Sequence, residues 1–241
     1  MSHYALFSGG HDSVVSTHKV MSEQKADTVL HIDTGIGIPE TQQYVKETCK
    51  NYGWDLDIVA SDFNYRDIVL ENGFPGPGVH IIMYSKLKER ALRKVARRHD
   101  GKPHFWTGVR SDESDRRFRN VTERVEEDSQ WFWHSPIREM TESDVLDYIQ
   151  QHEIQKNPVK QLYHHSGECL CGAFGNRPEE LVLLEAHYPK TADRIKDLED
   201  EVQKRHGYGK KSYWAHGDTD DKLIAAEHPD QMPLCTSCGD W

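Results

Sequence analysis

The sequence predicts an α/β fold built on a mainly parallel β-sheet with helices on both faces. Over roughly the first 150 residues, short apolar β-rich segments alternate with segments of helical periodicity. This alternation is expected when each strand is followed by a crossover helix. With 241 residues, the chain is long enough for one large core and a smaller appended part.

The predicted elements follow each other closely along this first part. Apolar or β-branched residues predict strands at 3–7 (HYALF), 28–32 (TVLHI), 55–60 (DLDIVA) and 104–109 (HFWTGV), whereas the aromatic segment 131–136 could be a strand or a packed loop. Helical patterns cover 12–23, 39–52, 80–99 and 141–151, and Gly-Pro residues make 73–78 a loop. Pro39 stands at the first helical position, and Thr141 is an N-cap with Asp144 three residues later.

The composition changes after Asn157 and Pro158. A cysteine-containing turn is followed by a helical stretch from 178 to about 206, a polar segment at 207–221 and a tail that ends in LCTSCGDW. We therefore expect an α/β domain at 1–158 and a helical C-terminal extension with metal-binding cysteines at 159–241.

The overall charge limits the function classes. Forty acidic residues against 30 Lys and Arg give a formal net charge of -10, which disfavours broad DNA binding through phosphate contacts. No apolar run approaches the roughly 18–20 residues that cross a bilayer. The first residues, MSHYALFSGG, lack the features of a signal peptide, so we expect a cytoplasmic protein without a membrane partner.

The segment SGGHDS between the first predicted strand and helix is a candidate phosphate loop. Its glycines allow backbone N–H groups to approach an anion, and the helix N-terminus adds partial positive charge. Ser8 and Ser13 add hydroxyl groups to the loop. The segment matches neither the Walker A nor the dinucleotide pattern. The alternative is an ordinary glycine turn.

Three further segments accompany this loop in order: DTGIGIPET from Asp33, TGVRSDES from Thr107 and HSPIREMTESDVLDYI from His134. Together the four segments resemble the motifs of the adenylyl-sulfate and PAPS reductase family of the PP-loop superfamily. The resemblance covers about residues 4–175. It implies a doubly wound sheet that binds an adenine nucleotide at the carboxyl ends of its strands.

The resemblance also assigns roles to individual residues. It implies that Ser8, Gly9, Gly10, Asp12 and Ser13 hold the phosphate or sulfate end of the nucleotide. It implies that the nucleoside is held at the end of the second strand, by His31, Asp33, Thr34 and Gly35. It implies that the nucleotide passes close to Gly108 and that Arg110 reaches its anionic part. The alternatives are a turn residue for Asp33, a kink for Gly108 and a surface ion pair for Arg110. The candidate catalytic residues are Asp12, Arg110 and Arg116.

Two basic segments are further candidates. Arg116, Arg117 and Arg119 could bind phosphate or sulfate oxygens, although acidic neighbours could neutralise them in a solvated loop. The run KLKERALRKVARR at 86–98 is typical of a solvated helix face, with a nucleic-acid surface as the alternative.

Four of the five cysteines form two close pairs, which predicts a metal centre. Cys169 and Cys171 form the first pair, and Cys235 and Cys238 form the second. Four thiolates suit a 4Fe–4S cluster or zinc, and the tight C-x-C spacing favours iron–sulfur. The alternatives are unrelated cysteines, or substitution by His164 and His165. Cys49 lies mid-helix and is expected to be buried.

The resemblance implies an enzyme that reduces adenylyl sulfate or PAPS to sulfite through thiol attack, with a thioredoxin-like reductant as partner. The chain departs from the reductases in two ways. It lacks the adjacent Cys-Cys pair of the cluster-bearing reductases, and it lacks the C-terminal Glu-Cys-Gly motif of the reductases. An alternative is a sulfurtransferase related to the cluster-bearing Dnd-type enzymes. It would use ATP, with Mg²⁺, to adenylate an acceptor such as a nucleic acid, and would transfer sulfur through the cluster. A non-enzymatic nucleotide-binding redox sensor is the second alternative.

Overall fold

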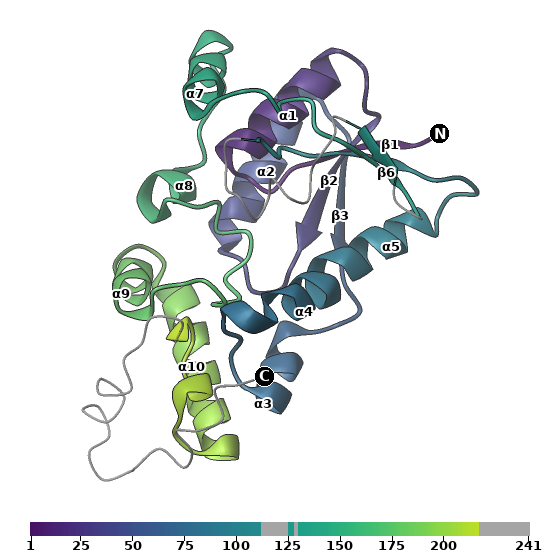
Figure 1. Cartoon of the computed structure of the whole chain (residues 1–241). Coiled ribbons are helices and arrows are strands. Elements are labelled where there is room, and N and C mark those ends of the chain that lie inside the picture. Colours follow the sequence, from purple (N-terminus) through teal and green to yellow (C-terminus); the bar gives the residue numbers. More distant parts are fainter. Residues whose placement is uncertain (112–124, 128–129, 217–241) are drawn as a thin grey trace. The chain divides into compact units, whose positions relative to one another are not determined.

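The computed structural model describes residues 1–111, 125–127 and 130–216. Within these residues, six strands form one sheet in the order β3-β2-β1-β4-β6-β5 (Figure 1). The strands are β1 (His3–Leu6), β2 (Thr28–Asp33), β3 (Leu56–Ala60), β4 (His104–Trp106), β5 (Val125–Glu127) and β6 (Phe132–His134). All neighbouring pairs are parallel except β5 with β6. The α/β fold with a mainly parallel sheet is therefore confirmed.

The strand order is that of a doubly wound sheet. From β1 the chain proceeds outward through β2 to β3 and then returns to place β4 on the other side of β1. The direction of winding reverses between β1 and β4, and the segments that follow these two strands diverge at this point. In open α/β sheets, ligands bind at such a switch point.

Helices cover both faces of the sheet. On one face, α1 (His11–Ser22), α2 (Pro39–Tyr52) and α7 (Glu142–Gln151) contribute to an apolar cluster with Phe7 and Val29. On the other face, α5 (Arg90–Ala96) packs with Leu30 and Phe105. The capping box predicted for α7 is present, because Thr141 and Asp144 bond to each other's backbone N–H groups.

The chain divides into two compact units, 1–60 with 90–168 and 61–89 with 169–241. The sequence boundary expected after 158 differs from this division. Residues 158–168, which include α8 (Pro158–Tyr163), belong to the first unit because they are hydrogen-bonded to its loops. The described elements of the second unit are α3 (Tyr65–Asn72), η1 (Pro77–Val79), α4 (His80–Tyr84), the π-helical turn η2 (Ser85–Glu89), α9 (Arg177–His187), α10 (Pro189–His206) and η3 (Lys210–Ser212).

Several elements differ from the sequence expectation. The single helix expected at 80–99 consists of α4, η2 and α5 and ends at Ala96. The helical stretch after 178 is interrupted at Tyr188, because the residue before a proline is disfavoured in a helix and Pro189 starts α10. The short elements α3, α8 and β5 were not expected. None of the described helices is long and apolar enough to cross a membrane.

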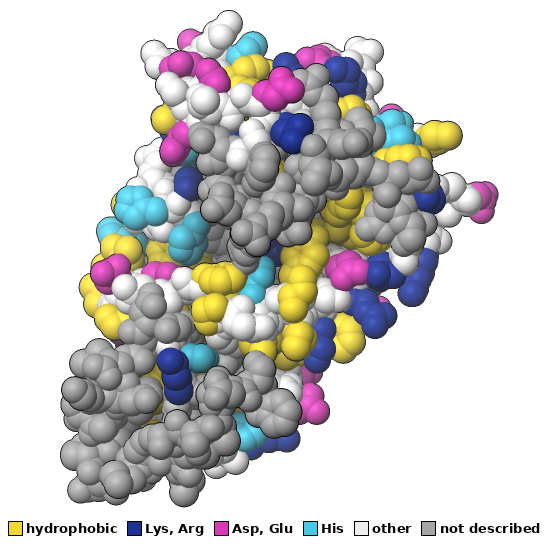
Figure 2. All heavy atoms as spheres, in the orientation of Figure 1, with side chains coloured by type: hydrophobic (Ala, Val, Ile, Leu, Met, Phe, Trp, Pro, Cys, Tyr) yellow, Lys and Arg dark blue, Asp and Glu magenta, His cyan; other side chains and the backbone are white. Residues whose placement is uncertain are grey.

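The basic helix segment is engaged within the fold. Arg98 pairs with Asp57, and the guanidinium of Arg93 lies over the Trp131 ring, 5.9 Å from its centroid. On the face shown in Figure 2, Lys and Arg side chains lie among acidic and hydrophobic ones. These contacts show that basic side chains of the segment pack against their neighbours, and the solvated helix face stays a prediction.

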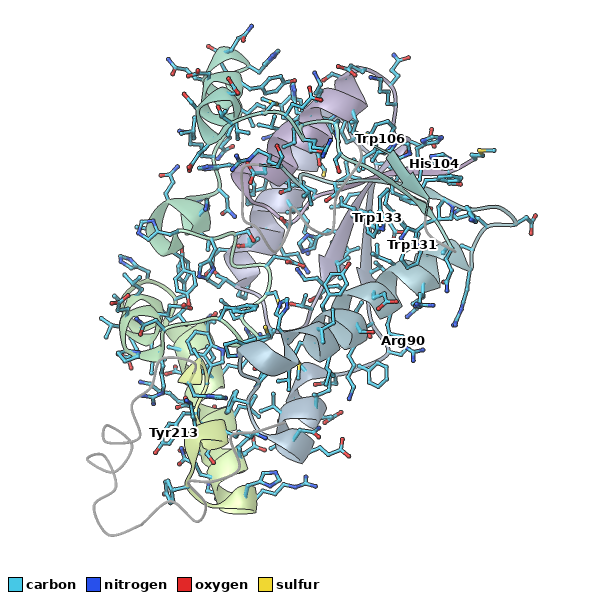
Figure 3. The ribbon with its side chains drawn as sticks, viewed as in Figure 1. Arg90, His104, Trp106, Trp131, Trp133 and Tyr213 are labelled. Carbon is cyan, nitrogen blue, oxygen red and sulfur yellow. The ribbon has the colours of Figure 1, made fainter. Side chains whose placement is uncertain are left out.

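A row of histidines crosses β1, β4 and β6. The rings of His3 and His104 stack with centroids 4.2 Å apart, and His104 Nδ1 is 2.7 Å from His134 Nε2. Trp106 stacks on His134, and His104 and Trp106, both labelled in Figure 3, belong to the same strand, β4. Burial lowers the pKa of His134 to about 4, and repulsion from His104 and His3 adds to this effect. Burial also lowers the pKa of His104, so His104 and His134 both favour the neutral imidazole.

This row predicts a loss of stability in mild acid. An unfolded histidine titrates near 6.5, so protons bind preferentially to the unfolded chain as the pH falls from about 6.5 to 4. Because His134 is only partly buried, we expect it to contribute about 1–2 kcal/mol to this loss. Chemical unfolding at pH 7 and pH 4.5 should show a smaller pH dependence for His134→Gln than for the unmodified protein. An identical pH dependence would contradict the interpretation.

Candidate functional site

The phosphate loop, residues 8–13, connects β1 to α1 at the switch point of the sheet. The Ser8 hydroxyl donates to Ser13 Oγ at 3.1 Å, and the Ser13 hydroxyl donates to the Gly10 carbonyl at 2.9 Å. Gly9 has φ +85°, and a Cβ there would lie 2.8 Å from Thr41 Cγ2. Glycine is therefore required at this position for both its conformation and its packing.

The loop presents a run of backbone donors. Within the described part of the chain, the N–H groups from Gly9 to Ser13 donate to no recorded acceptor, and no side chain caps α1. Consecutive N–H groups at a helix N-terminus, combined with the helix dipole, form a suitable environment for an anion. The predicted phosphate-binding residues are thus brought together in one loop.

A buried ion pair joins this loop to the segment after β4. Arg110 is only 6% exposed, and its Nε donates to Asp12 Oδ1 at 2.8 Å. A Cβ at Gly108 would lie 2.7 Å from the backbone of Asp12 and Ser13. Gly108 therefore permits the close approach of α1 itself, which is an additional reason for glycine there. The structure brings Asp12, Gly108 and Arg110 together, and contact of Gly108 and Arg110 with a nucleotide stays a prediction.

The residues expected to hold the nucleoside lie at the end of β2, where their described side chains also support the local backbone. His31 is buried, and its Nδ1 donates to the Phe7 carbonyl at 2.8 Å, directly before the phosphate loop. The Asp33 carboxylate accepts from the Gly35 N–H at 2.8 Å, as in a turn. Contact of His31, Asp33, Thr34 and Gly35 with a nucleoside stays a prediction.

The second motif tethers residues 166–168, which we call the tethered segment. Its three carbonyl groups accept hydrogen bonds from residues of the DTGIGIPET motif: Ser166 O from Thr41 Oγ1 at 2.5 Å, Gly167 O from the Ile38 N–H at 2.7 Å and Glu168 O from Thr34 Oγ1 at 2.8 Å. The motif therefore holds the chain segment that immediately precedes Cys169.

Asn157 is a site residue that the sequence reasoning missed. Its side chain donates to the Gly9 carbonyl in the phosphate loop at 2.9 Å and accepts from the Val159 N–H at 3.0 Å. The sequence did contain a partial signal, because Asn before Pro is typical of a helix N-cap. Its bond to Gly9, 148 residues away in the chain, had no local signal.

His11 lies in the phosphate loop, and its pKa is lowered by its surroundings. Burial lowers the pKa of His11, and the positive charges of Lys160 and Lys156 lower it further, while Asp12 opposes this change. His11 Nε2 is buried without a recorded hydrogen-bond partner in the described chain. The imidazole between Gly10 and Asp12 is therefore disposed to be neutral near physiological pH.

In the second unit, Cys169 and Cys171 lie in a turn whose backbone is held on both sides. The Leu170 carbonyl accepts from Trp214 Nε1 at 2.7 Å, and the Cys171 carbonyl accepts from the Tyr65 hydroxyl at 2.9 Å. The Cys169 thiol donates a hydrogen bond to the Cys171 sulfur. This hydrogen bond lowers the pKa of Cys171 to about 7, although burial acts in the opposite direction. A thiolate of this kind is the form that binds metals and attacks electrophiles.

A buried carboxylate supports this turn from α10. Glu199 is 4% exposed and forms a two-pronged ion pair with Arg177, at 2.9 and 3.0 Å. The same carboxylate accepts from the Trp214 N–H at 2.8 Å. Trp214 is therefore fixed through both its backbone and its indole, which links α9, α10 and the cysteine turn.

Other predicted site residues lie outside the described part of the chain. They are Arg116, Arg117, Arg119, Cys235 and Cys238. Among the described residues, no group of three or more His, Cys, Asp or Glu side chains is arranged to hold a metal ion. Cys49 lies in the core as expected, and burial raises its pKa to about 12.

Comparison with known proteins agrees with the geometry at the switch point. The family described as the phosphoadenosine phosphosulfate reductase domain matches residues 2–238. The chain belongs to this family. Membership covers almost the whole sequence, including the phosphate loop, the second motif and the four paired cysteines.

Individual relatives are more distant. The chain is 25% identical over 156 residues to a phosphoadenosine 5′-phosphosulfate reductase of Alkalilimnicola ehrlichii, covering 62% of this chain and 61% of that protein. The match thus spans about three fifths of the relative's length. The fold is similar to that of the phosphate complex of the PAPS reductase from Candida auris, with a TM-score of 0.50 and 16% identity over 68% of this chain and 78% of that one. The U34-tRNA thiolase NcsA from Methanococcus maripaludis, with its 4Fe-4S cluster, matches with a TM-score of 0.49 and 15% identity over 100% of this chain and 76% of that one.

The ion pair predicts how strongly the phosphate loop depends on Asp12. Asp12→Ala removes the acceptor that orients Arg110, so we expect adenine-nucleotide affinity to fall about ten- to a hundredfold. Titration calorimetry with ATP and with adenylyl sulfates measures this loss. Asp67→Ala is the matched control, because Asp67 also lies in the first turn of a helix, α3, and should leave the affinity unchanged. Unaltered binding by Asp12→Ala would remove the phosphate-loop interpretation.

Proposed function

We propose that this protein reduces a sulfonated adenine nucleotide, adenylyl sulfate or its 3′-phosphorylated form PAPS, and releases sulfite. Membership of the reductase family supports this proposal. The observation that carries it is found at one switch point. There, loop N–H groups that have no acceptor among the described residues lie in the same site as the buried, oriented guanidinium of Arg110.

The described residues supply anion binding and charge stabilisation. The N–H groups of the phosphate loop would bind phosphate or sulfonate oxygens, and Arg110 would stabilise the charge that develops on the leaving phosphate. The Asp12 carboxylate would orient Arg110, whereas the Asp12 N–H would be one of the loop donors to the anion. Arg116 would place a second positive charge near the same leaving phosphate. We propose these roles for Asp12, Arg110 and Arg116 on the basis of the motif match and the Asp12–Arg110 ion pair.

The reaction requires two thiols. A thiolate attacks the sulfonate sulfur, the bond between sulfur and the phosphate oxygen breaks, and the nucleotide leaves as AMP or adenosine bisphosphate. A second thiolate then attacks the S-sulfocysteine, releasing sulfite and leaving a disulfide. A thioredoxin-like dithiol would finally reduce this disulfide. Cys49 is an unsuitable nucleophile because it is buried and its pKa is raised to about 12.

We also propose that Cys169, Cys171, Cys235 and Cys238 can bind one metal centre, a 4Fe–4S cluster rather than zinc. The same cysteines would supply the attacking thiolate of the reductase only in the form of the protein that holds no metal. The donor chemistry of the first pair fits, because the two sulfurs are adjacent and Cys171 is readily deprotonated. A cluster of this kind would supply redox or sulfur-carrying chemistry when bound. The hydrogen bonds from Trp214 and Tyr65 to the turn would orient the two thiolates.

A second candidate function is ATP-dependent sulfur transfer. It is favoured by the pair of thiols at Cys169 and Cys171, whose turn is fixed by hydrogen bonds from Trp214 and Tyr65. In this case the loop would bind the phosphates of ATP, Mg²⁺ would enter with the nucleotide, and pyrophosphate would be released. The acceptor would be a nucleic acid or a small molecule. A sensor without turnover would bind the same nucleotides.

Product analysis distinguishes these functions. Reduced protein incubated with thioredoxin and adenylyl sulfate or PAPS should release sulfite, because the dithiol regenerates the attacking thiol. A parallel incubation with ATP and Mg²⁺ is assayed for pyrophosphate. Pyrophosphate without sulfite would overturn the reductase proposal in favour of sulfur transfer, whereas nucleotide binding without either product would indicate a sensor.

The metal proposal has its own test. Protein purified without oxygen should contain iron and sulfide and absorb visible light, and Cys171→Ser should lose most of this metal because one of four ligands is removed. Cys49→Ser is the matched control, since Cys49 lies in the core away from the paired cysteines in the sequence. Full metal content in Cys171→Ser would contradict joint ligation.

A further inference from the structure

The side-chain amide of Asn157 forms hydrogen bonds with three backbone groups. Asn157 is 1% exposed, and its Nδ2 donates to Gly9 O at 2.9 Å and to Ser166 O at 3.3 Å, while Oδ1 accepts from the Val159 N–H at 3.0 Å. These partners determine which end of the amide is nitrogen, because a reversed amide would place oxygen against two carbonyl groups. The side chain therefore acts as a double donor and a helix cap at once.

The bond to Gly9 sets the direction of the following N–H. The Gly9–Gly10 peptide is trans, as are all described peptides, so the Gly9 carbonyl and the Gly10 N–H point in opposite directions. With the carbonyl held inward by Asn157, the Gly10 N–H points away from Asn157. This N–H has no recorded acceptor within the described chain.

Glycine makes this orientation sensitive to Asn157. A peptide between two glycines can rotate more easily than others, because neither residue has a Cβ. Without a donor at position 157, the buried Gly9 carbonyl would have no hydrogen-bond partner. Rotation of the peptide toward water would then lower the free energy, because water could supply the missing hydrogen bond. The same rotation would turn the Gly10 N–H away from a bound anion.

We propose that Asn157 is a positioning residue of the anion site, which holds the Gly9–Gly10 peptide so that the Gly10 N–H faces the phosphate or sulfonate group. This proposal rests on the proposed binding of an adenine nucleotide at the phosphate loop. It adds a residue from the start of α8, which lies outside the four recognised motifs, to the nucleotide site.

Asn157→Ser isolates this role. Serine caps helices as well as asparagine does, so the bond to the Val159 N–H can be retained. The Ser166 carbonyl keeps its bond from Thr41 Oγ1, so the tethered segment stays anchored. Only the Gly9 carbonyl loses its hydrogen-bond donor entirely. Asn157→Asp is a second variant, which keeps the cap and the side-chain size but also removes the donor.

The matched control is Asn64→Ser. Asn64 caps α3 in the same way, with its side chain accepting from the Arg66 N–H at 2.8 Å, and it is exposed. The experiment measures the dissociation constants of adenosine 3′,5′-bisphosphate and inorganic phosphate by calorimetry, together with circular dichroism and the thermal midpoint. Measurements are made well below the midpoint, so that each variant is folded.

We expect Asn157→Ser to bind both ligands roughly tenfold or more weakly while folded, and Asn64→Ser to bind them normally. A purely structural role would lower the thermal midpoint of Asn157→Ser and leave its affinities unchanged, which would overturn the proposal. If Asn157→Ser does not fold, the same comparison is made with Asn157→Asp. If the unmodified protein binds neither ligand, the proposed function fails as well, and the two failures are thereby distinguished.

Discussion

The convergence of two loops at the switch point depends on the ion pair between Asp12 and Arg110. The two residues are 98 positions apart in the chain, and their ion pair forms where the segments that follow β1 and β4 diverge. Arg110 is almost completely buried, so its charge requires a partner; removing one member of such a pair typically costs about 3–5 kcal/mol. Gly108 allows the approach, because its α-carbon has no room for a side chain against the first turn of α1.

The second motif has two uses in this fold. Its resemblance to a nucleoside-binding segment concerns side chains, yet the described side chains of Thr34 and Thr41 bond to the carbonyls of the tethered segment. Gly37 fits the same arrangement, because a Cβ there would lie 2.6 Å from Glu168 O. The motif therefore holds the backbone of the tethered segment beside the phosphate loop. It would also form part of the surface that a nucleotide contacts. Sites supported by such fixed neighbours bind with little reorganisation.

Much of the fold was predictable from local patterns. The strands at β1, β2 and β3 were expected within one or two residues because apolar and β-branched runs are short and bounded by turn residues. The cap of α7 was expected from Thr141 and Asp144. The helices α3 and α8 were missed because eight and six residues are too few to show a clear periodicity. The break at Pro189 was readable in principle, since proline disfavours a helical residue before it.

The sequence by itself determined the α/β class, the position of the phosphate loop and the grouping of four cysteines into two closely spaced pairs. Periodicity, glycine spacing and cysteine spacing are local properties of the chain. Only the tertiary structure decided which distant residues complete the loop. Arg110 reaches Asp12, and Asn157 reaches Gly9 across 148 residues. It likewise showed that Trp214 and Tyr65 hold the cysteine turn. A hydrogen bond between distant residues depends on how the chain packs, and it leaves no periodic pattern near either partner.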